Sequence, residues 1–348
     1  MPNTVPESVK KEQYELKSTF FYNKLTSNGY FKLFKDIEVV ALVEGRTLDW
    51  SKREEWGISS DAWELIEKRH ISPVLVFVHP KILRLYPTYL KYYRSIAMVP
   101  QKGLKAISHI SNVESIEAGQ VDTTRIRQET IHKLVSVLNE FISLVVNLSS
   151  GITENEIQGM MYATAGTNID GSWRNQIGNE GERVIRSIIF KELGKLGDIS
   201  SVVDKDQLTI PKDEINYDRF LTSIGEVKTI NLKNGYSVYF SSEPDVTLFA
   251  PDGSIVGVIE IKAGLDPAGA LERLGAMFKS FENTLAEYPT AVTVLVISCI
   301  THEVRRRLDA SMVVRQTFVT TDITSGDSEK RKFVNRLRVI MKLAAPSL

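Results

Sequence analysis

Three ionisable residues in the C-terminal half of the chain have the types and spacing of a cation-binding hydrolytic site. Asp245 follows Pro244, and Glu260 and Lys262 lie fifteen positions further on in the sequence Glu260-Ile261-Lys262. Two carboxylates and a backbone carbonyl are oxygen ligands of the kind that Mg²⁺ prefers, and the ion completes its octahedron with water and phosphate oxygens. An ammonium group nearby can hold an attacking water or offset charge on a phosphorane-like transition state. The set therefore predicts hydrolysis of a phosphodiester.

Two predicted strands bring these residues together. Residues 244–250 and 255–262 have strand-like apolar content, and the Pro-Asp-Gly-Ser sequence between them, residues 251–254, is a strong hairpin turn. Asp245 lies six residues before this turn and Glu260 six after it, so pairing places both carboxylates at matching heights on neighbouring strands. Because side chains alternate along a strand, Glu260 and Lys262 project from one face while Ile261 turns into the core.

The elements around this hairpin predict an α/β fold. Apolar spacing predicts helices at 176–196 and 267–288, and short apolar runs predict strands at 236–241 and 291–298. The order from residue 176 is thus helix, three strands, helix, strand, which predicts a core with a mixed sheet. Residues 166–175 are predicted to form a polar loop, and residues 198–234 are polar and predicted to be irregular.

The first 165 residues predict a mainly helical N-terminal region, assigned to DNA binding or dimerisation. Helical periodicity covers 13–24, 60–69 and 128–149, the last as a core helix. Residues 37–43 predict a short apolar strand, and residues 71–78 predict a buried strand. Residues 166–348 are assigned to a catalytic domain with a basic C-terminal extension.

The sequence has P-D and then, after about fifteen residues, E-X-K. This pattern lies between an upstream helix and a downstream helix-strand pair. It resembles the PD-(D/E)XK nuclease superfamily, typified by type II restriction endonucleases. The resemblance spans residues 176 to about 298. It implies that Asp245, Glu260 and the carbonyl of Ile261 bind Mg²⁺ and that Lys262 assists hydrolysis.

The same resemblance implies a supporting glutamate on the first core helix. The sequence GNEGERVI, residues 178–185, offers Glu180 and Glu182, and Glu182 is preferred because its spacing places it at the edge of the apolar face. A glutamate in the first turn of a helix also interacts favourably with the helix dipole, which explains either residue without a catalytic role.

A second motif of the same kind competes with the first. Glu226-Val227-Lys228 also follows an acidic residue, Asp218, but this set lacks a flanking apolar strand pair and an intervening turn, whereas residues 244–262 have both. Asp252 is interpreted as a turn residue and Asp266 as a helix cap.

A narrower resemblance, to the XcyI-type restriction endonucleases, rests on residues 263–273, 92–94 and 100–103. Small residues directly after Lys262 would let the substrate backbone approach, although ordinary turn chemistry explains each glycine equally well. This resemblance implies a GC-rich six-base palindrome such as CCCGGG. Cleavage of both strands of a palindrome requires a twofold homodimer.

Contacts with double-stranded DNA must come from local clusters, since Lys+Arg and Asp+Glu both number 43. Residues 68–113 contain eight Lys/Arg, no Asp/Glu and interleaved tyrosines. Arg94 and Lys102 are the predicted phosphate contacts in this segment. The alternative is that the segment forms a basic, partly buried helix packed against acidic helices elsewhere. Residues 299–348 hold ten Lys/Arg against five Asp/Glu, which a helix-end charge cluster explains equally well. The base-reading candidates are Arg174, Asn175, Arg273 and Arg305.

Composition excludes other classes. The single cysteine, Cys299, excludes a disulfide framework or thiolate zinc cluster and fits a reducing compartment. The N-terminus lacks a signal-peptide pattern, and the apolar runs are too short for a bilayer, so a cytoplasmic protein with no membrane partner is expected. The sequence has no P-loop or dinucleotide fingerprint, which predicts no nucleotide cofactor.

The alternatives to a type II restriction endonuclease are a structure-specific repair or recombination nuclease of the same superfamily and a non-catalytic DNA-binding protein.

Overall fold

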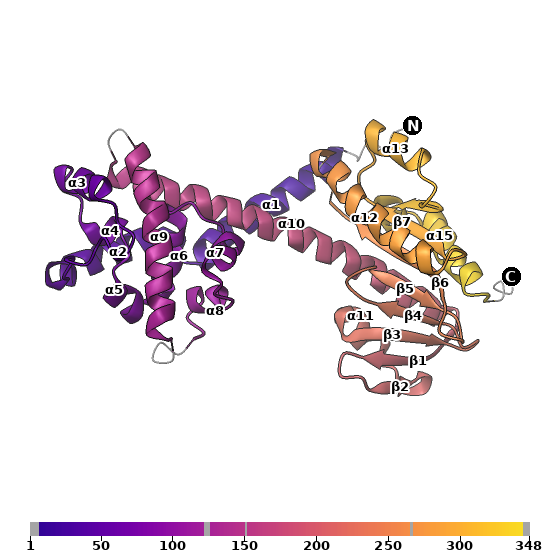
Figure 1. Cartoon of the computed structure of the whole chain (residues 1–348). Helices are drawn as coiled ribbons and strands as arrows, with labels where there is room; N and C mark the ends of the chain where they lie inside the picture. Colours follow the sequence, from indigo (N-terminus) through magenta and orange to yellow (C-terminus); the bar gives the residue numbers. More distant parts are fainter. Residues whose placement is uncertain (1–6, 122–125, 150–151, 265–266, 344–348) are drawn as a thin grey trace. The chain divides into compact units, whose positions relative to one another are not determined.

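The computed structural model in Figure 1 describes residues 7–121, 126–149, 152–264 and 267–343. The chain divides into two compact units. One is Leu16–Trp173, and the other combines Met1–Glu15 with Arg174–Leu348. Helices α1 (Glu7–Ser27) and α10 (Glu154–Lys195) contribute residues to both units.

Every regular element in the described part of the unit Leu16–Trp173 is helical. Its helices, besides α1 and α10, are α2 (Tyr30–Val43), α3 (Ser60–Lys68), α4 (Pro73–Val76), α5 (Pro80–Leu85), α6 (Leu90–Ile96), α7 (Gln101–Ser108), α8 (Val113–Glu117) and α9 (Gln128–Leu148). The predicted strands at 37–43 and 71–78 are therefore wrong: the first lies in α2 and the second surrounds α4. Ile37 and Val40 of the first segment and Val74, Leu75 and Val76 of the second are buried, and a short apolar run does not by itself distinguish a strand from a helix.

Helix α9 is the predicted core helix of this unit. It buries Leu134, Leu138, Ile142 and Val146, spaced four residues apart, in the apolar core. Among the described residues, α9 alone is long and apolar enough to cross a membrane by length and composition. The buried side of α9 packs into the core of the helical unit.

The second unit contains a mixed sheet of eight strands in the order β2-β1-β3-β4-β5-β6-β7-β8. Pairing is antiparallel from β2 to β6 and parallel from β6 to β8. The strands are β1 (Ile199–Asp204), β2 (Thr209–Pro211), β3 (Val227–Leu232), β4 (Ser237–Phe240), β5 (Val246–Phe249), β6 (Ile255–Lys262), β7 (Val292–Ile297) and β8 (Gln316–Val319). The predicted α/β class with a mixed sheet is confirmed, and the sheet is larger than predicted.

The prediction that residues 198–234 are irregular is wrong. They form β1, β2, β3 and the short helix α11 (Tyr217–Thr222). Within these strands Val202 and Ile230 are buried, whereas Ser201 and Asn231 lie on the half-buried opposite face. A strand with one apolar and one polar face has a mixed composition, which explains why the apolar signal was weak.

The predicted loop at 166–175 is also wrong, because helix α10 continues through it. Gly166 and Gly171 lower helix propensity there. Ile169 and Trp173 are nevertheless buried, so tertiary packing outweighs the weak local preference.

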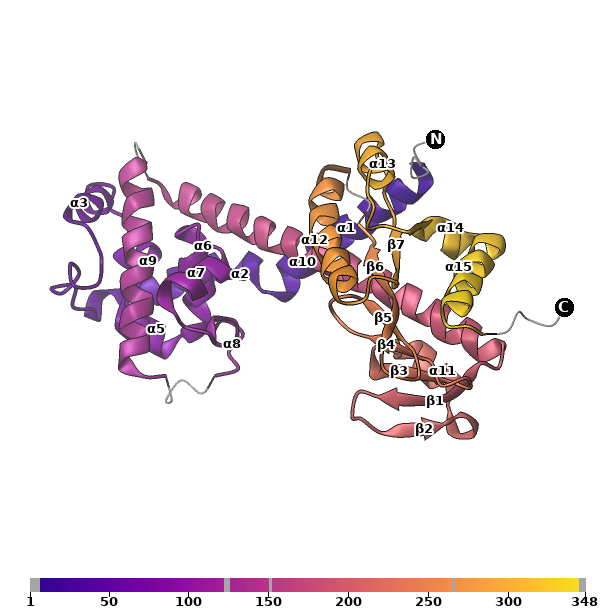
Figure 2. The ribbon, with the colours of Figure 1, turned by 45° about the vertical axis from the view of Figure 1, so that its right-hand side comes forward.

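Helices cover both faces of the sheet in the second unit. On one face, Ile185 and Phe190 of α10 pack with Leu337 of α15 (Asp327–Ile340) against the inward side chains of the sheet. On the other face, α12 (Pro267–Glu287) and α13 (His302–Asp309) cover β6 and β7. Figure 2 shows α12 and α15 on either side of these two strands. The remaining helix, α14 (Thr320–Ser325), precedes α15.

Candidate active site

Strands β5 and β6 form the predicted hairpin. Two backbone hydrogen bonds of 2.9 Å close its turn: the N–H of Gly253 donates to the carbonyl of Ala250, and the N–H of Ala250 donates to the carbonyl of Ser254. Asp252 accepts hydrogen bonds from Ser254, as expected of a turn residue. Val246 pairs with Ile259. Asp245 directly precedes this pair and Glu260 directly follows it, so the two carboxylates lie at the same level of neighbouring strands.

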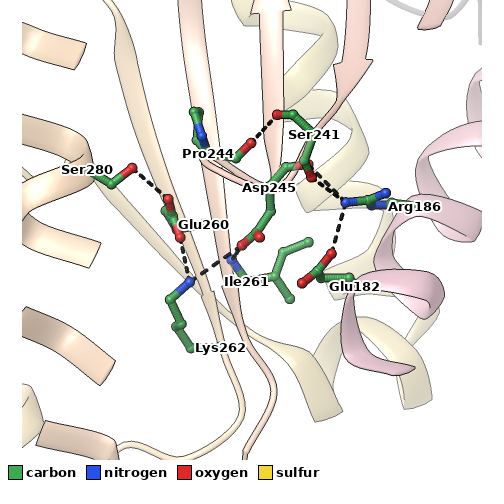
Figure 3. Close-up of polar contacts among 9 residues, drawn as sticks. All are labelled: Glu182, Arg186, Ser241, Pro244, Asp245, Glu260, Ile261, Lys262 and Ser280. Atoms are coloured by element: carbon green, nitrogen blue, oxygen red, sulfur yellow. Dashed lines mark hydrogen bonds and ion pairs between the residues drawn. The ribbon is translucent and has the colours of Figure 1, made fainter. Parts of the chain in front are cut away.

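The structure brings Asp245, Glu260 and Lys262 together on one face of the sheet. Lys262 Nζ lies 2.5 Å from Glu260 Oε2 and 3.5 Å from Asp245 Oδ2. Both acidic residues are only 4% exposed. The intervening Ile261 packs into the core behind the opposite face. The ammonium group therefore lies between two buried carboxylates, as Figure 3 shows.

Each carboxylate also accepts a hydrogen bond from an uncharged donor. The backbone N–H of Ile261 donates to Asp245 Oδ2 at 2.6 Å, and Ser280 Oγ of α12 donates to Glu260 Oε1 at 2.6 Å. The sequence reasoning missed Ser280. The available signal was a serine between Met277 and Phe281, on a helix face that is otherwise apolar.

Burial and charge shift the protonation of this cluster. Burial raises the pKa of Asp245 to about 7; Lys262 opposes this shift, whereas Glu260 and Glu182 add to it. Burial acts to lower the pKa of Lys262, but attraction to Asp245 and Glu260 outweighs it, and that pKa is raised above its usual value. Lys262 is therefore a persistent cation at neutral pH rather than a base.

The donor set fits a small hard cation. Strand β5 begins opposite Ile259, so the backbone of β6 at Ile261 extends beyond the paired part of β5, beside Asp245. Within the described ranges, no group of three or more His, Cys, Asp or Glu is placed to hold a metal ion. A cation here would depend on two carboxylates, a carbonyl and water, which is the coordination that Mg²⁺ usually has in proteins.

Glu182 lies beside this cluster and contacts it through an arginine that the sequence reasoning missed. Arg186 Nη2 is 2.9 Å from Glu182 Oε2 and 2.6 Å from the carbonyl of Ser241, and it lies 3.5 Å from the carbonyl of Asp245 (Figure 3). One guanidinium thus links α10 to the segment that leads into β5. Glu180, by contrast, pairs with Arg183 at the surface.

Helix α10 also packs closely against the chain directly after Lys262. A Cβ atom added at Gly181 would lie 2.0 Å from the Cβ of Ala263. The next residue, Gly264, accepts a hydrogen bond from Arg273 of α12 at 3.1 Å through its carbonyl. The segment after Lys262 is therefore held from both sides by helices.

The prediction that Arg94 contacts phosphate is wrong, because this residue is 2% exposed. Its Nε lies 2.5 Å from Glu117 Oε1, and its Nη1 donates to the carbonyl of Val99. Tyr92 and Tyr93 are fully buried, with hydroxyls that donate to backbone carbonyls. For Arg94 the alternative holds: this basic residue packs against an acidic residue of another helix, α8.

The other predicted DNA contacts lie on helices. Lys102 is exposed on α7, Arg174 and Asn175 are exposed on α10, and Arg273 and Arg305 are half-buried on α12 and α13. Their contact with DNA stays a prediction. Asp266, predicted to cap a helix, lies outside the described residues.

The competing motif at Glu226 is a surface charge cluster. Val227 and Lys228 begin strand β3, whereas Asp218 lies on helix α11, so the motif does not lie on a pair of neighbouring strands. Glu226 pairs with Lys205 at 3.1 Å and with Arg219 at 2.9 Å, and Asp218 is exposed. These contacts give the motif a structural role.

Comparison with known protein families gives one match. The family model described as XcyI restriction endonuclease matches residues 58–343, a range that contains Asp245, Glu260 and Lys262. No individual curated protein matches the chain. The family match covers most of the chain, and the chain belongs to the XcyI restriction endonuclease family.

Proposed function

We propose that this protein is a Mg²⁺-dependent type II restriction endonuclease with a PD-(D/E)XK catalytic core. Membership of a restriction endonuclease family makes double-stranded DNA its substrate. The observation that carries the finer assignment is the position of Lys262 Nζ, between Asp245, directly before β5, and Glu260 on β6. The order and spacing of these three residues are those of the P-D…E-X-K motif.

In this proposal Asp245, Glu260 and the carbonyl of Ile261 hold Mg²⁺. Bound there, the ion would neutralise charge on the scissile phosphate and lower the pKa of a water nucleophile. Lys262 carries a persistent positive charge, so it donates hydrogen bonds to the attacking water or to the phosphate and offsets negative charge as the transition state forms.

Glu182 supports the site without being a ligand in this arrangement. Its carboxylate holds Arg186, which in turn binds the carbonyl of Ser241 and lies near that of Asp245. The backbone that carries Asp245 is thereby held against α10. A carboxylate placed within about 0.5 Å of its productive position is what metal-assisted catalysis requires.

The substrate site is proposed to be a GC-rich palindrome, such as CCCGGG, that a homodimer cuts with one active site per strand. Residues 1–165 are proposed to contribute to DNA binding and dimerisation, and residues 166–348 to catalysis. Lys102, Arg174, Asn175, Arg273 and Arg305 stay the proposed DNA contacts.

Digestion of a sequenced plasmid with Mg²⁺, followed by run-off sequencing of the ends, tests this function. Discrete fragments with one end sequence are expected, together with loss of cleavage in Asp245→Ala. A smear, or cleavage confined to branched substrates, would instead indicate a repair or recombination nuclease. Full double-strand cleavage by Asp245→Ala would refute the assigned active site.

A further inference from the structure

The two oxygens of the Glu260 carboxylate have different partners. Oε2 lies 2.5 Å from the ammonium of Lys262, whereas Oε1 accepts the hydroxyl of Ser280 at 2.6 Å. Both Glu260 and Ser280 are buried, with 4% and 6% exposure. A hydrogen bond between a buried hydroxyl and a carboxylate is stronger than one exposed to water, because solvent does not compete for either group.

Helix packing fixes the position of Ser280 beside Glu260. The neighbouring side chains Met277 and Phe281 are fully buried in the core that α12 forms with β6 and β7. The backbone of Ser280 therefore cannot move away from Glu260 without a movement of the helix. Asp245 is restrained in a similar way, since its Oδ2 accepts the N–H of Ile261 at 2.6 Å.

We propose that Ser280 is a positioning residue: it holds Oε1 of Glu260 so that this carboxylate presents one oxygen to the metal ion, and the site thereby favours Mg²⁺ over Ca²⁺. The inference rests on the proposed Mg²⁺ site. Mg²⁺ demands octahedral geometry with few carboxylate oxygens, whereas Ca²⁺ takes six to eight oxygens and is often chelated by both oxygens of one carboxylate.

Loss of the hydroxyl would change what Glu260 offers. The terminal torsion of a glutamate side chain is broad, so a carboxylate without this restraint can rotate and present both oxygens. Such a carboxylate suits Ca²⁺ better and orients less well for Mg²⁺. Removal of a group that orients a metal ligand typically costs on the order of tenfold to a hundredfold in metal affinity.

Metal binding to the full-length protein, without DNA, tests the proposal. Mn²⁺ bound to the protein is followed by electron paramagnetic resonance and displaced with Mg²⁺ or with Ca²⁺, which gives the ratio of the two affinities. In Ser280→Ala this ratio is expected to shift towards Ca²⁺ by roughly tenfold or more. Ser280→Thr, which keeps the hydroxyl, should retain the wild-type ratio.

Thr284→Ala is the matched control, because Thr284 lies one turn further along α12 and its hydroxyl donates to the carbonyl of Ser280 at 3.1 Å. It should bind both ions as the wild type does. A wild-type ratio in Ser280→Ala would overturn the proposal. An equal loss of affinity for Mg²⁺ and Ca²⁺ in both Ser280→Ala and Ser280→Thr, together with a lower urea midpoint, would also overturn it. That pattern would indicate that Ser280 contributes to helix packing alone.

A wild-type protein that binds Mn²⁺ no better than Asp245→Asn would overturn the metal site itself. That result would remove the proposed function as well as the role of Ser280. The outcome could also be that Mn²⁺ binding depends on Asp245 while the ratio of the Mg²⁺ and Ca²⁺ affinities is unchanged in Ser280→Ala. That result would contradict the role of Ser280 and leave the metal site in place.

Discussion

Gly181 of α10 faces Ala263, the residue directly after Lys262, at a distance that leaves no room for a side chain. A Cβ at Gly181 would lie 2.0 Å from the Cβ of Ala263. This contact sets how closely the helix that carries Glu182 and Arg186 approaches the end of β6. The geometry of the active site therefore depends on the absence of one methyl group.

Gly181→Ala should consequently reduce cleavage by tenfold or more and destabilise the protein by about 1–3 kcal/mol, the usual cost of overpacking. Gly178→Ala is the matched control, because a Cβ there meets nothing within 4 Å. It should be neutral or stabilise the helix by up to about 1 kcal/mol. Urea unfolding and plasmid cleavage measure both variants, and equal behaviour of the two would contradict the close-packing argument.

Lys262→Met should abolish cleavage and lower the stability of the metal-free protein by about 3 kcal/mol, because it leaves two buried carboxylates without their cation. Added Mg²⁺ should raise the melting temperature of this variant more than that of the wild type, since the ion replaces the missing charge. Lys228→Met, at the corresponding position of the competing motif, should cleave normally. Thermal unfolding with EDTA or Mg²⁺ gives the comparison, and an identical Mg²⁺ effect in all three proteins would count against the site.

The raised pKa of Asp245 makes the stability of the metal-free protein pH-dependent. Between its ordinary value of 3.8 and about 7, Asp245 is protonated in the folded state and ionised in the unfolded state. The folded state thus binds more protons, and the contribution of this group to the free energy of unfolding falls as pH rises through that range. Asp245→Asn removes the effect, so its stability relative to the wild type should increase from pH 4.5 to pH 8 in EDTA. A difference that stays constant with pH would mean that Asp245 titrates normally.

Arg186→Met should lower kcat by roughly tenfold with little change in KM, because the residue holds the backbone of Asp245 rather than the DNA. Arg186→Lys should recover part of the loss, since an ammonium can keep one of the carbonyl contacts. Arg183→Met is the control: Arg183 lies on the same helix but pairs with Glu180 at the surface. Steady-state kinetics on a duplex oligonucleotide would separate the variants, and an equal loss in Arg183→Met would argue against a positioning role for Arg186.

The two basic residues first predicted to contact phosphate should behave differently. Arg94→Met should destabilise the protein by about 3 kcal/mol by leaving the buried Glu117 without its partner. Its DNA affinity, measured on folded protein, should keep the wild-type salt dependence. Lys102→Ala should leave stability unchanged and reduce the slope of log affinity against log salt by about 1. A reduced slope in Arg94→Met would mean that this residue reaches DNA after all.

The sequence by itself was sufficient for the hairpin and for the placement of its three ionisable residues. The turn at 251–254 and the alternation of the two flanking strands are local signals, and in a hairpin the turn determines the register. Asp245, Glu260 and Lys262 therefore follow from eighteen consecutive residues. The types and spacing of these residues predict a cation site and hydrolysis, and that chemistry stays a proposal.

Only the tertiary structure decided which residues hold this cluster and which charges are buried. The contact of Ser280 with Glu260 joins residues 20 positions apart, that of Arg94 with Glu117 joins residues 23 apart, and that of Arg186 with Ser241 joins residues 55 apart. The polar face of β1 and β3 and the continuous helix α10 were missed for the same reason. Local composition describes what a segment can form alone, whereas these features depend on which distant apolar faces bury it, and that choice is made by the packing of the whole unit.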